Sequence, residues 1–203
     1  MQEPLISIKQ VANSEEFEQC LRIRYKVFVE EKKKNGLKSH HYDEDRYDAQ
    51  SIHFLAYIDD VPVATNRIIP YSEQSGMPVT TMWNIDTYKR YKIAEVSKLC
   101  ILPDHRGKKL LTYFTLLNFK YGLKHGYEFY FINANVTMTS FLKRVGLVMF
   151  DTPKIYRPVE EMGVPFFLKL DEIKPSIRRR IDALDERFQL LSHPTHKSLN
   201  IGQ

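Results

Sequence analysis

The chain has 203 residues, enough for one domain or for one domain with a terminal extension. Its hydrophobic share of 43% provides for a substantial core, but no apolar run approaches the ~20 residues of a membrane span. The net charge of +5 comes without the interleaved aromatic pattern of a nucleic-acid module, so nucleic acid is the least favoured partner. The first ten residues lack the basic flank and apolar core of a signal peptide, and two cysteines, Cys20 and Cys100, do not suggest a disulfide framework. We therefore expect a cytoplasmic protein whose Cys100 is a buried, inert thiol.

Hydrophobic periodicity predicts a mixture of strands and helices in the first half of the chain. Asn13 or Ser14 is the candidate N-cap of the first helix, and Asp59-Asp60 separates two apolar runs as the turn of a β-hairpin does. In chain order we expect a strand at 5–11, a helix through the string LRIRYKVFVEE, a loop at 32–49, and hairpin strands at 51–58 and 61–69. The loop has no periodicity and is long enough to be mobile or functional.

The second half is organised around a strand, a basic loop and a helix between residues 93 and 126. Pro103 ends the strand because proline has no N–H for a ladder. The helix has apolar residues at steps of three and four, and we expect Gly122 and then His125-Gly126 to end it. The elements expected are a strand at 93–102, a helix from 110, a strand at 129–133, a short helix at 139–144, and closing strands at 147–150 and 165–170.

The C-terminal region predicts a helix with one apolar face. Its stripe alternates steps of four and three, at Ile173, Ile177, Ile181, Leu184, Phe188 and Leu191. We expect a domain at 1–170, an amphipathic helix at 171–192 and a disordered tail at 193–203. The helix has two interpretations: it packs on the domain, or it joins two copies of the chain as a homodimer.

The loop between the central strand and its helix has the features of a phosphate site. The first N–H groups of a helix have no intrahelical partner and the helix dipole makes that end partly positive. Arg106, Lys108 and Lys109 add fixed charge at this point, and Gly107 allows a ligand to approach the backbone. The alternative is an ordinary basic turn on the surface of the protein.

The string ILPDHRGKKL, residues 101–110, resembles the acyl-donor loop of the GNAT superfamily of N-acyltransferases. In that loop Arg or Gln is followed by two residues, a Gly, one residue, and then Gly or Ala. This chain keeps Arg106 and Gly107, but it has Asp104 where Arg or Gln is usual and Lys109 where a small residue is usual. The resemblance implies an α/β fold with a mixed, largely antiparallel, splayed sheet flanked by helices, followed here by the C-terminal amphipathic helix.

Four further patterns are similar to one branch of this superfamily. They are Arg24 in the string RYKVFVEE, Asp45-x-x-Asp48 with His53, Arg67 at the end of the hairpin, and Glu95-x-Ser97-Lys98 in the central strand. In this order they resemble the acyl-homoserine-lactone autoinducer synthases and the related N-acyl amino acid synthases. The resemblance runs from about Phe17 to about Gly146.

The resemblance implies a site without a metal. Its residues are Glu95 and Ser97 as catalytic groups, Arg24, Asp45, Asp48, Arg67 and Lys98 for substrate, and Leu99, Ile101, Arg106, Gly107, Lys108 and Lys109 for the acyl donor. Transfer of an acyl group to an amine needs a carboxylate to take the proton of the ammonium, and Glu95 is the candidate base. The alternative role for Glu95 is a structural ion pair with Arg67 or Arg24, and for Asp45 and Asp48 it is a solvated acidic turn.

The implied function is transfer of a fatty acyl group from a thioester to the amine of an amino acid or similar small molecule. The donor is acyl carrier protein or coenzyme A. Lys109 in the donor loop and the basic runs at 32–34 and 178–180 favour the acidic carrier protein. The alternative for each basic run is a solvated face without a partner. Two alternatives stay open: an acetyl-coenzyme A-dependent N-acetyltransferase, and a sensor of acyl thioesters without turnover. Leu142 follows Phe141 where many acetyltransferases have a tyrosine acid, which argues against the first alternative.

Overall fold

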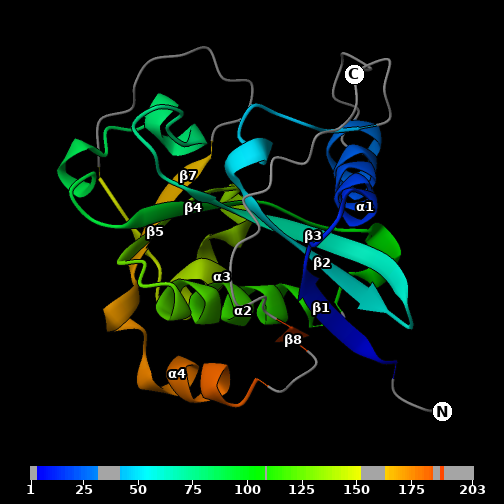
Figure 1. Cartoon of the computed structure of the whole chain (residues 1–203). Helices are drawn as coiled ribbons and strands as arrows, with labels where there is room; N and C mark the ends of the chain where they lie inside the picture. The colour runs from blue at the N-terminus through cyan, green and yellow to red at the C-terminus, as the bar shows by residue number, and fades with distance from the viewer. Residues whose placement is uncertain (1–3, 32–41, 108, 152–162, 185–187, 190–203) are drawn as a thin grey trace. The chain divides into compact units, whose positions relative to one another are not determined.

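The computed structural model describes residues 4–31, 42–107, 109–151, 163–184 and 188–189 (Figure 1). The chain divides into two compact units: unit 1 consists of residues 1–68, 98–117 and 184–203, and unit 2 of residues 69–97 and 118–183. In the part of the chain that the structure describes, no helix combines the length and the apolar character that crossing a membrane requires.

Most elements belong to one unit. Unit 1 holds β1 (Ile6–Gln10), α1 (Ser14–Arg24), the π-helix η1 (Tyr25–Glu31), η2 (Asp48–Gln50), β2 (Ile52–Ile58), η5 (Pro103–His105) and β8 (Phe188–Gln189). Unit 2 holds η3 (Pro78–Thr81), η4 (Asp86–Tyr88), β5 (Phe129–Ala134), η6 (Val136–Met138), α3 (Thr139–Arg144), β6 (Val148–Met149), β7 (Val164–Lys169), η7 (Leu170–Glu172) and α4 (Pro175–Asp182). Residues of β3 (Val61–Pro70), β4 (Ile93–Ile101) and α2 (Leu110–Lys124) occur in both units.

The strands of unit 1 are ordered by a tight hairpin. β1 is antiparallel to β2, β2 is antiparallel to β3, and β8 is parallel to β1. Asp59 and Asp60 both have positive φ, 48° and 64°, which is the backbone of the two-residue turns that match strand twist. The resulting register places His53 opposite Arg67. The predicted hairpin is confirmed, and its register places His53 beside Arg67, a residue of the predicted site.

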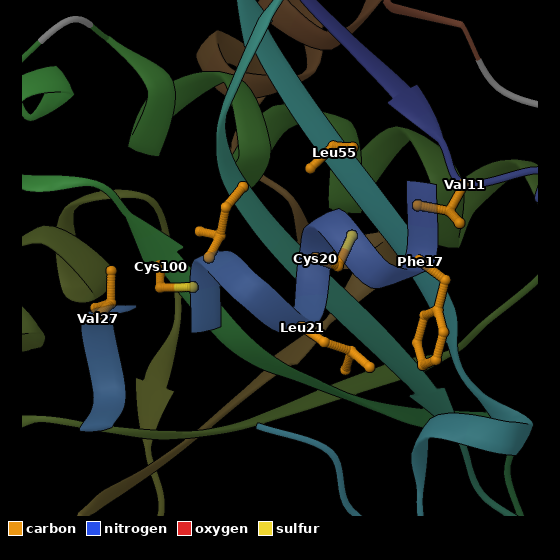
Figure 2. Packing of buried hydrophobic residues seen from close by; sticks show 8 residues of the cluster. Val11, Phe17, Cys20, Leu21, Val27, Leu55 and Cys100 are labelled. Carbon is orange, nitrogen blue, oxygen red and sulfur yellow. The ribbon is translucent and has the colours of Figure 1, made fainter. Parts of the chain in front are cut away.

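Helix α1 begins with a reciprocal cap and covers the core of unit 1. The Asn13 side chain accepts from Glu16 N at 2.9 Å, and Glu16 accepts from Ala12 N at 2.8 Å. Side chains of α1 and of its neighbours form one buried cluster, which consists of Val11, Phe17, Cys20, Leu21, Ile23, Val27, Leu55 and Cys100 (Figure 2). Burial raises the pKa of Cys20 to about 11 and that of Cys100 to about 12, so both thiols stay neutral and unreactive, as predicted for Cys100.

The strands of unit 2 pair in both directions: β4 and β5 are parallel, whereas β7 is antiparallel to β5 and to β6.

Helix α2 ends at Lys124, so the prediction that Gly122 ends it is wrong. A Cβ at Gly122 would lie 2.7 Å from both Leu170 Cδ1 and Tyr130 Oη, and the glycine therefore serves close packing inside the helix. Gly126, with φ of 68°, follows the end of the helix.

The C-terminal helix is shorter than predicted. α4 covers only Pro175–Asp182, and Phe188 lies in strand β8 beside β1, outside any helix. Ile177 and Ile181 are buried, which supports packing within the chain as the role of this part of the stripe. Leu191 and the tail at 193–203 lie outside the described residues, and the division at residue 170 stays a prediction.

Candidate functional site

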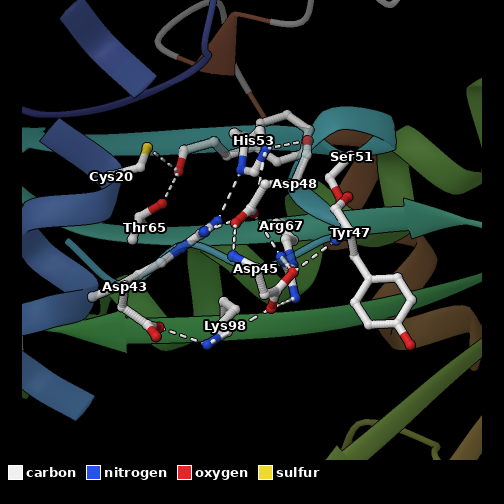
Figure 3. Close-up of polar contacts among 12 residues, drawn as sticks. Cys20, Asp43, Asp45, Tyr47, Asp48, Ser51, His53, Thr65, Arg67 and Lys98 are labelled. Atoms are coloured by element: carbon white, nitrogen blue, oxygen red, sulfur yellow. Dashed lines mark hydrogen bonds and ion pairs between the residues drawn. The ribbon is translucent and has the colours of Figure 1, made fainter. Parts of the chain in front are cut away.

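Two arginines in unit 1 converge on one aspartate (Figure 3). Arg24, the last residue of α1, donates to Asp48 Oδ1 at 2.8 Å, and Arg67 of β3 donates to the same oxygen at 2.6 Å. Arg67 also binds both carboxylate oxygens of Asp45, at 2.7 and 2.8 Å. The side chains of Arg24, Asp48 and Arg67 are at most 1% exposed, while that of Asp45 is 31% exposed. The pairs form a buried ionic cluster with one partly accessible carboxylate.

His53 completes this cluster as a neutral ring. Its Nδ1 lies 2.8 Å from Arg24 Nη2, and because a guanidinium only donates, Nδ1 accepts. Its Nε2 lies 3.1 Å from the carbonyl oxygen of Asp48, which only accepts, so these partners assign the proton to Nε2. Burial, together with the positive charge of Arg24, lowers the pKa of His53 to about 3. His53 therefore orients Arg24 without adding a third positive charge.

The two aspartates are held in the charged form. Burial alone would raise the pKa of Asp48, but the charges of Arg24 and Arg67 outweigh it and hold the pKa well below its usual range. The pKa of Asp45 is lowered too: burial opposes the shift, and the hydrogen bonds and charge of Arg67 cause it. Because Asp48 is buried between Arg24 and Arg67, the interpretation as a solvated acidic turn is wrong for Asp48, while Asp45 is partly exposed.

Lys98 extends the cluster from β4. Its Nζ lies 2.5 Å from Asp43 Oδ2 and 3.9 Å from Asp45 Oδ2, and its side chain is 23% exposed. Its φ of 52° is left-handed, which is unusual for a residue other than glycine and breaks the regular alternation of side chains along a strand. The structure thus brings together all five residues predicted for substrate, and their role there stays a prediction. Asp43 and His53 were absent from that set, although a histidine within the apolar string SIHFLAYI is a signal for a buried polar contact.

The predicted donor loop also lies in unit 1. Leu99 and Ile101 are in β4, Gly107 has φ of 81° and Lys109 has φ of 62°, while Lys108 lies outside the described residues. Lys109 thus has the left-handed backbone that favours glycine, which costs a residue with a Cβ roughly 1–2 kcal/mol.

Arg106 of this loop is paired with a carboxylate. Its Nη1 and Nη2 donate to the two oxygens of Glu31 at 2.8 and 2.6 Å, and its Nε donates to the carbonyl of Ile101 at 3.2 Å. An open groove of about 460 Å³ lies beside this pair, lined by Lys26, Glu30, Glu31, Leu102, Pro103, Asp104 and His105.

Glu95 lies in unit 2, in the part of β4 that pairs with β5. It is 2% exposed, and its Oε2 accepts from the backbone N–H of Val79 in η3 at 2.6 Å. Its register partner is Phe131, whose ring packs against Tyr88 and Phe150 at centroid distances of 5.2 and 5.7 Å. Ser97 is half-buried further along the same strand. The carboxylate is thus fixed by a backbone donor beside aromatic rings, and its catalytic role stays a prediction.

Among the residues that the structure describes, no group of three or more His, Cys, Asp and Glu side chains is arranged so that it could bind a metal ion. The model of the family N-acyl amino acid synthase FeeM matches residues 19–169, a range that contains every candidate described above. The chain belongs to this N-acyl amino acid synthase family.

Solved structures agree on the fold of this synthase. FeeM itself, an N-acyl amino acid synthase from uncultured soil microbes, is 17% identical, with a TM-score of 0.64 over 84% of this chain and 93% of FeeM. BjaI, a CoA-dependent acyl-homoserine lactone synthase solved with SAM and isopentyl-CoA, is 17% identical, with a TM-score of 0.67 over 91% of this chain and 93% of BjaI. A putative N-acetyltransferase from Lactobacillus plantarum is 18% identical, with a TM-score of 0.60 over 81% of this chain and 98% of the acetyltransferase.

These likenesses confirm the α/β acyltransferase fold predicted for the synthase from its GNAT-like loop. Membership of the family confirms the predicted class of reaction: the protein is an N-acyltransferase that moves an acyl group from a thioester to an amine.

Proposed function

We propose that this N-acyltransferase joins a fatty acyl group from acyl carrier protein to the amine of an amino acid. The observation that carries the proposal is the match of the N-acyl amino acid synthase family over residues 19–169. In the reaction the amine nitrogen attacks the thioester carbonyl, the C–N bond forms and the C–S bond breaks. The carrier leaves as the thiol or thiolate, and the proton that the amine loses passes to a base.

Glu95 is the residue we assign as that base. Glu95 is a buried carboxylate whose Oε2 accepts from the backbone N–H of Val79, and a carboxylate is the type of group that takes the proton of a substrate ammonium. The hydrogen bond from Val79 also fixes the direction of the carboxylate, which a base acting directly or through one water requires. Ser97 is assigned as a second catalytic group on the same strand.

The acceptor amino acid carries an ammonium and a carboxylate. The unit 1 cluster has one partly exposed side chain of opposite charge for each of these groups. Asp45 and Lys98 are its partly exposed members, with 31% and 23% of their side chains accessible. We assign Asp45 to the ammonium and Lys98 to the carboxylate of the acceptor. Arg24, Asp48 and Arg67 are too deeply buried for this contact and hold Asp45 in place.

The carrier protein is proposed as donor because of an exposed basic face in unit 2. Arg179 and Arg180 are exposed on α4 beside Arg178, whose Nε lies 3.8 Å from Asp182. Lys174, next to the start of α4, donates to the carbonyl of Arg144 at the end of α3 at 3.3 Å, so these two basic segments adjoin. An acidic carrier protein suits such a face. The second basic run, Lys32-Lys33-Lys34, lies outside the described residues.

The experiment compares donors. Purified protein is given amino acids with the same long acyl chain on carrier protein and on coenzyme A, and with acetyl donors, and amide products are identified by mass spectrometry. We expect N-acyl amino acids from the long-chain carrier donor, with kcat/KM falling steeply as salt rises because the attraction is screened over about 8–10 Å.

Reversal of two exposed charges tests the basic face. Arg179→Glu with Arg180→Glu is expected to lower kcat/KM for the carrier donor selectively, whereas Lys124→Glu, at the exposed end of α2, is the control. Equal efficiency on coenzyme A with a flat salt response refutes the carrier assignment. Product with acetyl-coenzyme A alone identifies an acetyltransferase, and no amide with any donor identifies a sensor.

A further inference from the structure

The pairing of Arg106 with Glu31 bears on which acyl donor the enzyme prefers. All three nitrogens of the Arg106 side chain donate within the chain: Nη1 and Nη2 to the two oxygens of Glu31, and Nε to the carbonyl of Ile101. Nη1 and Nη2 form the planar fork with which a guanidinium binds two oxygens of a phosphate. Here the two oxygens of one carboxylate occupy this fork. Arg106 is the residue of the donor loop best suited to hold a phosphate, and its fork is already taken by a residue 75 positions away.

The surroundings of this pair are acidic. Glu30, Glu31 and Asp104 line the same groove, against Lys26 and Arg106. Asp104 stands where the resembling loops have Arg or Gln, so a positive charge is replaced by a negative one. The groove side of the loop therefore holds three carboxylates and two cations, while Lys109 adds a positive charge to the loop itself.

Such a field acts unequally on the two donors. Coenzyme A carries a pyrophosphate and a ribose phosphate, whereas the phosphopantetheine arm of a carrier protein carries one phosphodiester. Electrostatic repulsion by a carboxylate therefore grows with the number of phosphates in the donor. It is weaker for the arm of a carrier protein, which has a single phosphodiester.

We infer that Glu31 is a specificity-determining residue that occupies Arg106 and selects against coenzyme A thioesters in favour of donors with a single phosphodiester. The inference rests on the proposed use of the donor loop for the phosphates of the acyl donor. It adds a negative determinant, in the donor loop of unit 1, to the basic face described for the carrier protein.

The test removes the negative charge of Glu31 and keeps the size and shape of its side chain. Glu31→Gln removes the charge paired with Arg106, and Glu30→Gln makes the same change at the adjacent exposed carboxylate of η1 as the matched control. Dissociation constants of free coenzyme A are measured by calorimetry, without turnover. KM is measured for one acyl chain on N-acetylcysteamine, on 4′-phosphopantetheine and on coenzyme A.

We expect Glu31→Gln to tighten coenzyme A binding by about 3- to 10-fold, the range for one or two exposed charge interactions. KM should fall by a similar factor for the coenzyme A donor, less for phosphopantetheine, and remain unchanged for N-acetylcysteamine, which has no phosphate. Glu30→Gln should change coenzyme A binding less than twofold. In an Arg106→Gln background the gain from Glu31→Gln should be smaller, because no guanidinium is released and only the relief of carboxylate repulsion remains.

Three results overturn the inference: equal effects of the two variants on coenzyme A, weaker binding of coenzyme A by Glu31→Gln, or no measurable binding of coenzyme A by that variant. Because binding is measured without turnover, these results are distinct from failure of the proposed function. That failure is shown by the absence of amide product with every donor while coenzyme A binding still responds to Glu31.

Discussion

His53 makes the stability of this protein sensitive to mild acid. In the folded protein the ring is 4% exposed, accepts from Arg24 and donates to the carbonyl of Asp48, and lies 4.8 Å from the ring of Phe17. Burial and the positive charges of Arg24 and Arg67 lower its pKa to about 3, against an ordinary value of about 6.5. The unfolded chain therefore binds a proton at this residue before the folded chain does.

The sign and size of the effect follow from this difference in pKa. Above pH 6.5 neither state protonates His53 and its contribution to stability is complete; as the pH falls from about 6.5 towards about 3 the unfolded state is favoured progressively. Each pH unit in this window costs about 1.4 kcal/mol, so a change from about pH 7.5 to about pH 5.0 costs about 2 kcal/mol from this residue alone. The paired aspartates contribute only at lower pH, because their pKa values are shifted down from an ordinary value near 4.

The substitution that isolates the effect is His53→Asn. The asparagine oxygen takes the place of Nδ1 as an acceptor for Arg24 but has no titration in this range. Urea unfolding followed by circular dichroism at about pH 7.5 and pH 5.0 gives the free energy of unfolding of both proteins. We expect the variant to be less stable at pH 7.5, and to lose about 2 kcal/mol less than the wild type between the two pH values. Equal losses in the two proteins would refute a neutral, acid-sensitive His53.

Three further substitutions test the site and the packing. Glu95→Gln should lower kcat by roughly a hundredfold or more at saturating amine, the scale of a positioned base; turnover near the wild-type rate removes Glu95 from the mechanism. Lys98→Met should raise KM for the amino acid about tenfold, a typical effect of losing a charged hydrogen bond, and leave KM for the donor unchanged; the reverse result would assign Lys98 to the donor. Gly122→Ala should lower the free energy of unfolding, measured by urea denaturation, by about 1–3 kcal/mol, because its Cβ would approach Tyr130 Oη to 2.7 Å. An unchanged free energy of unfolding would show that Tyr130 and Leu170 move aside.

Local patterns were sufficient to predict most elements. The turn at Asp59-Asp60 and the N-cap at Asn13 depend on chemistry within a few residues, and both are found where expected. Predictions failed where contacts between residues far apart in the sequence determine the secondary structure. Gly122 lies inside α2 because Tyr130 and Leu170 come close to it, and Phe188 lies in a strand because β1 offers an edge to pair with. A hydrophobic stripe at helical spacing contains no information about such an edge.

The candidate residues could be named from the sequence, but their pairs could not. Resemblance to the synthases indicated Arg24, Asp48 and Arg67, and their role in the reaction stays a prediction. Which arginine meets which aspartate depends on the hairpin register and on where α1 ends. The pairing of Glu31 with Arg106 joins residues 75 positions apart, and no local spacing indicates it.

The buried cluster argues for a site more than for stability. Ion pairs as deeply buried as those of Arg24, Asp48 and Arg67 seldom stabilise a protein more than apolar residues of the same volume would, because each charge loses its hydration. Within the described cluster the charges of these two arginines are balanced by Asp48 and Asp45, and a neutral His53 keeps that balance. What the arrangement provides is a fixed direction for Asp45, whose two oxygens are both held by Arg67 while part of the side chain remains accessible. A carboxylate held in this way keeps its place when an ammonium approaches, as the acceptor role that we propose for Asp45 requires.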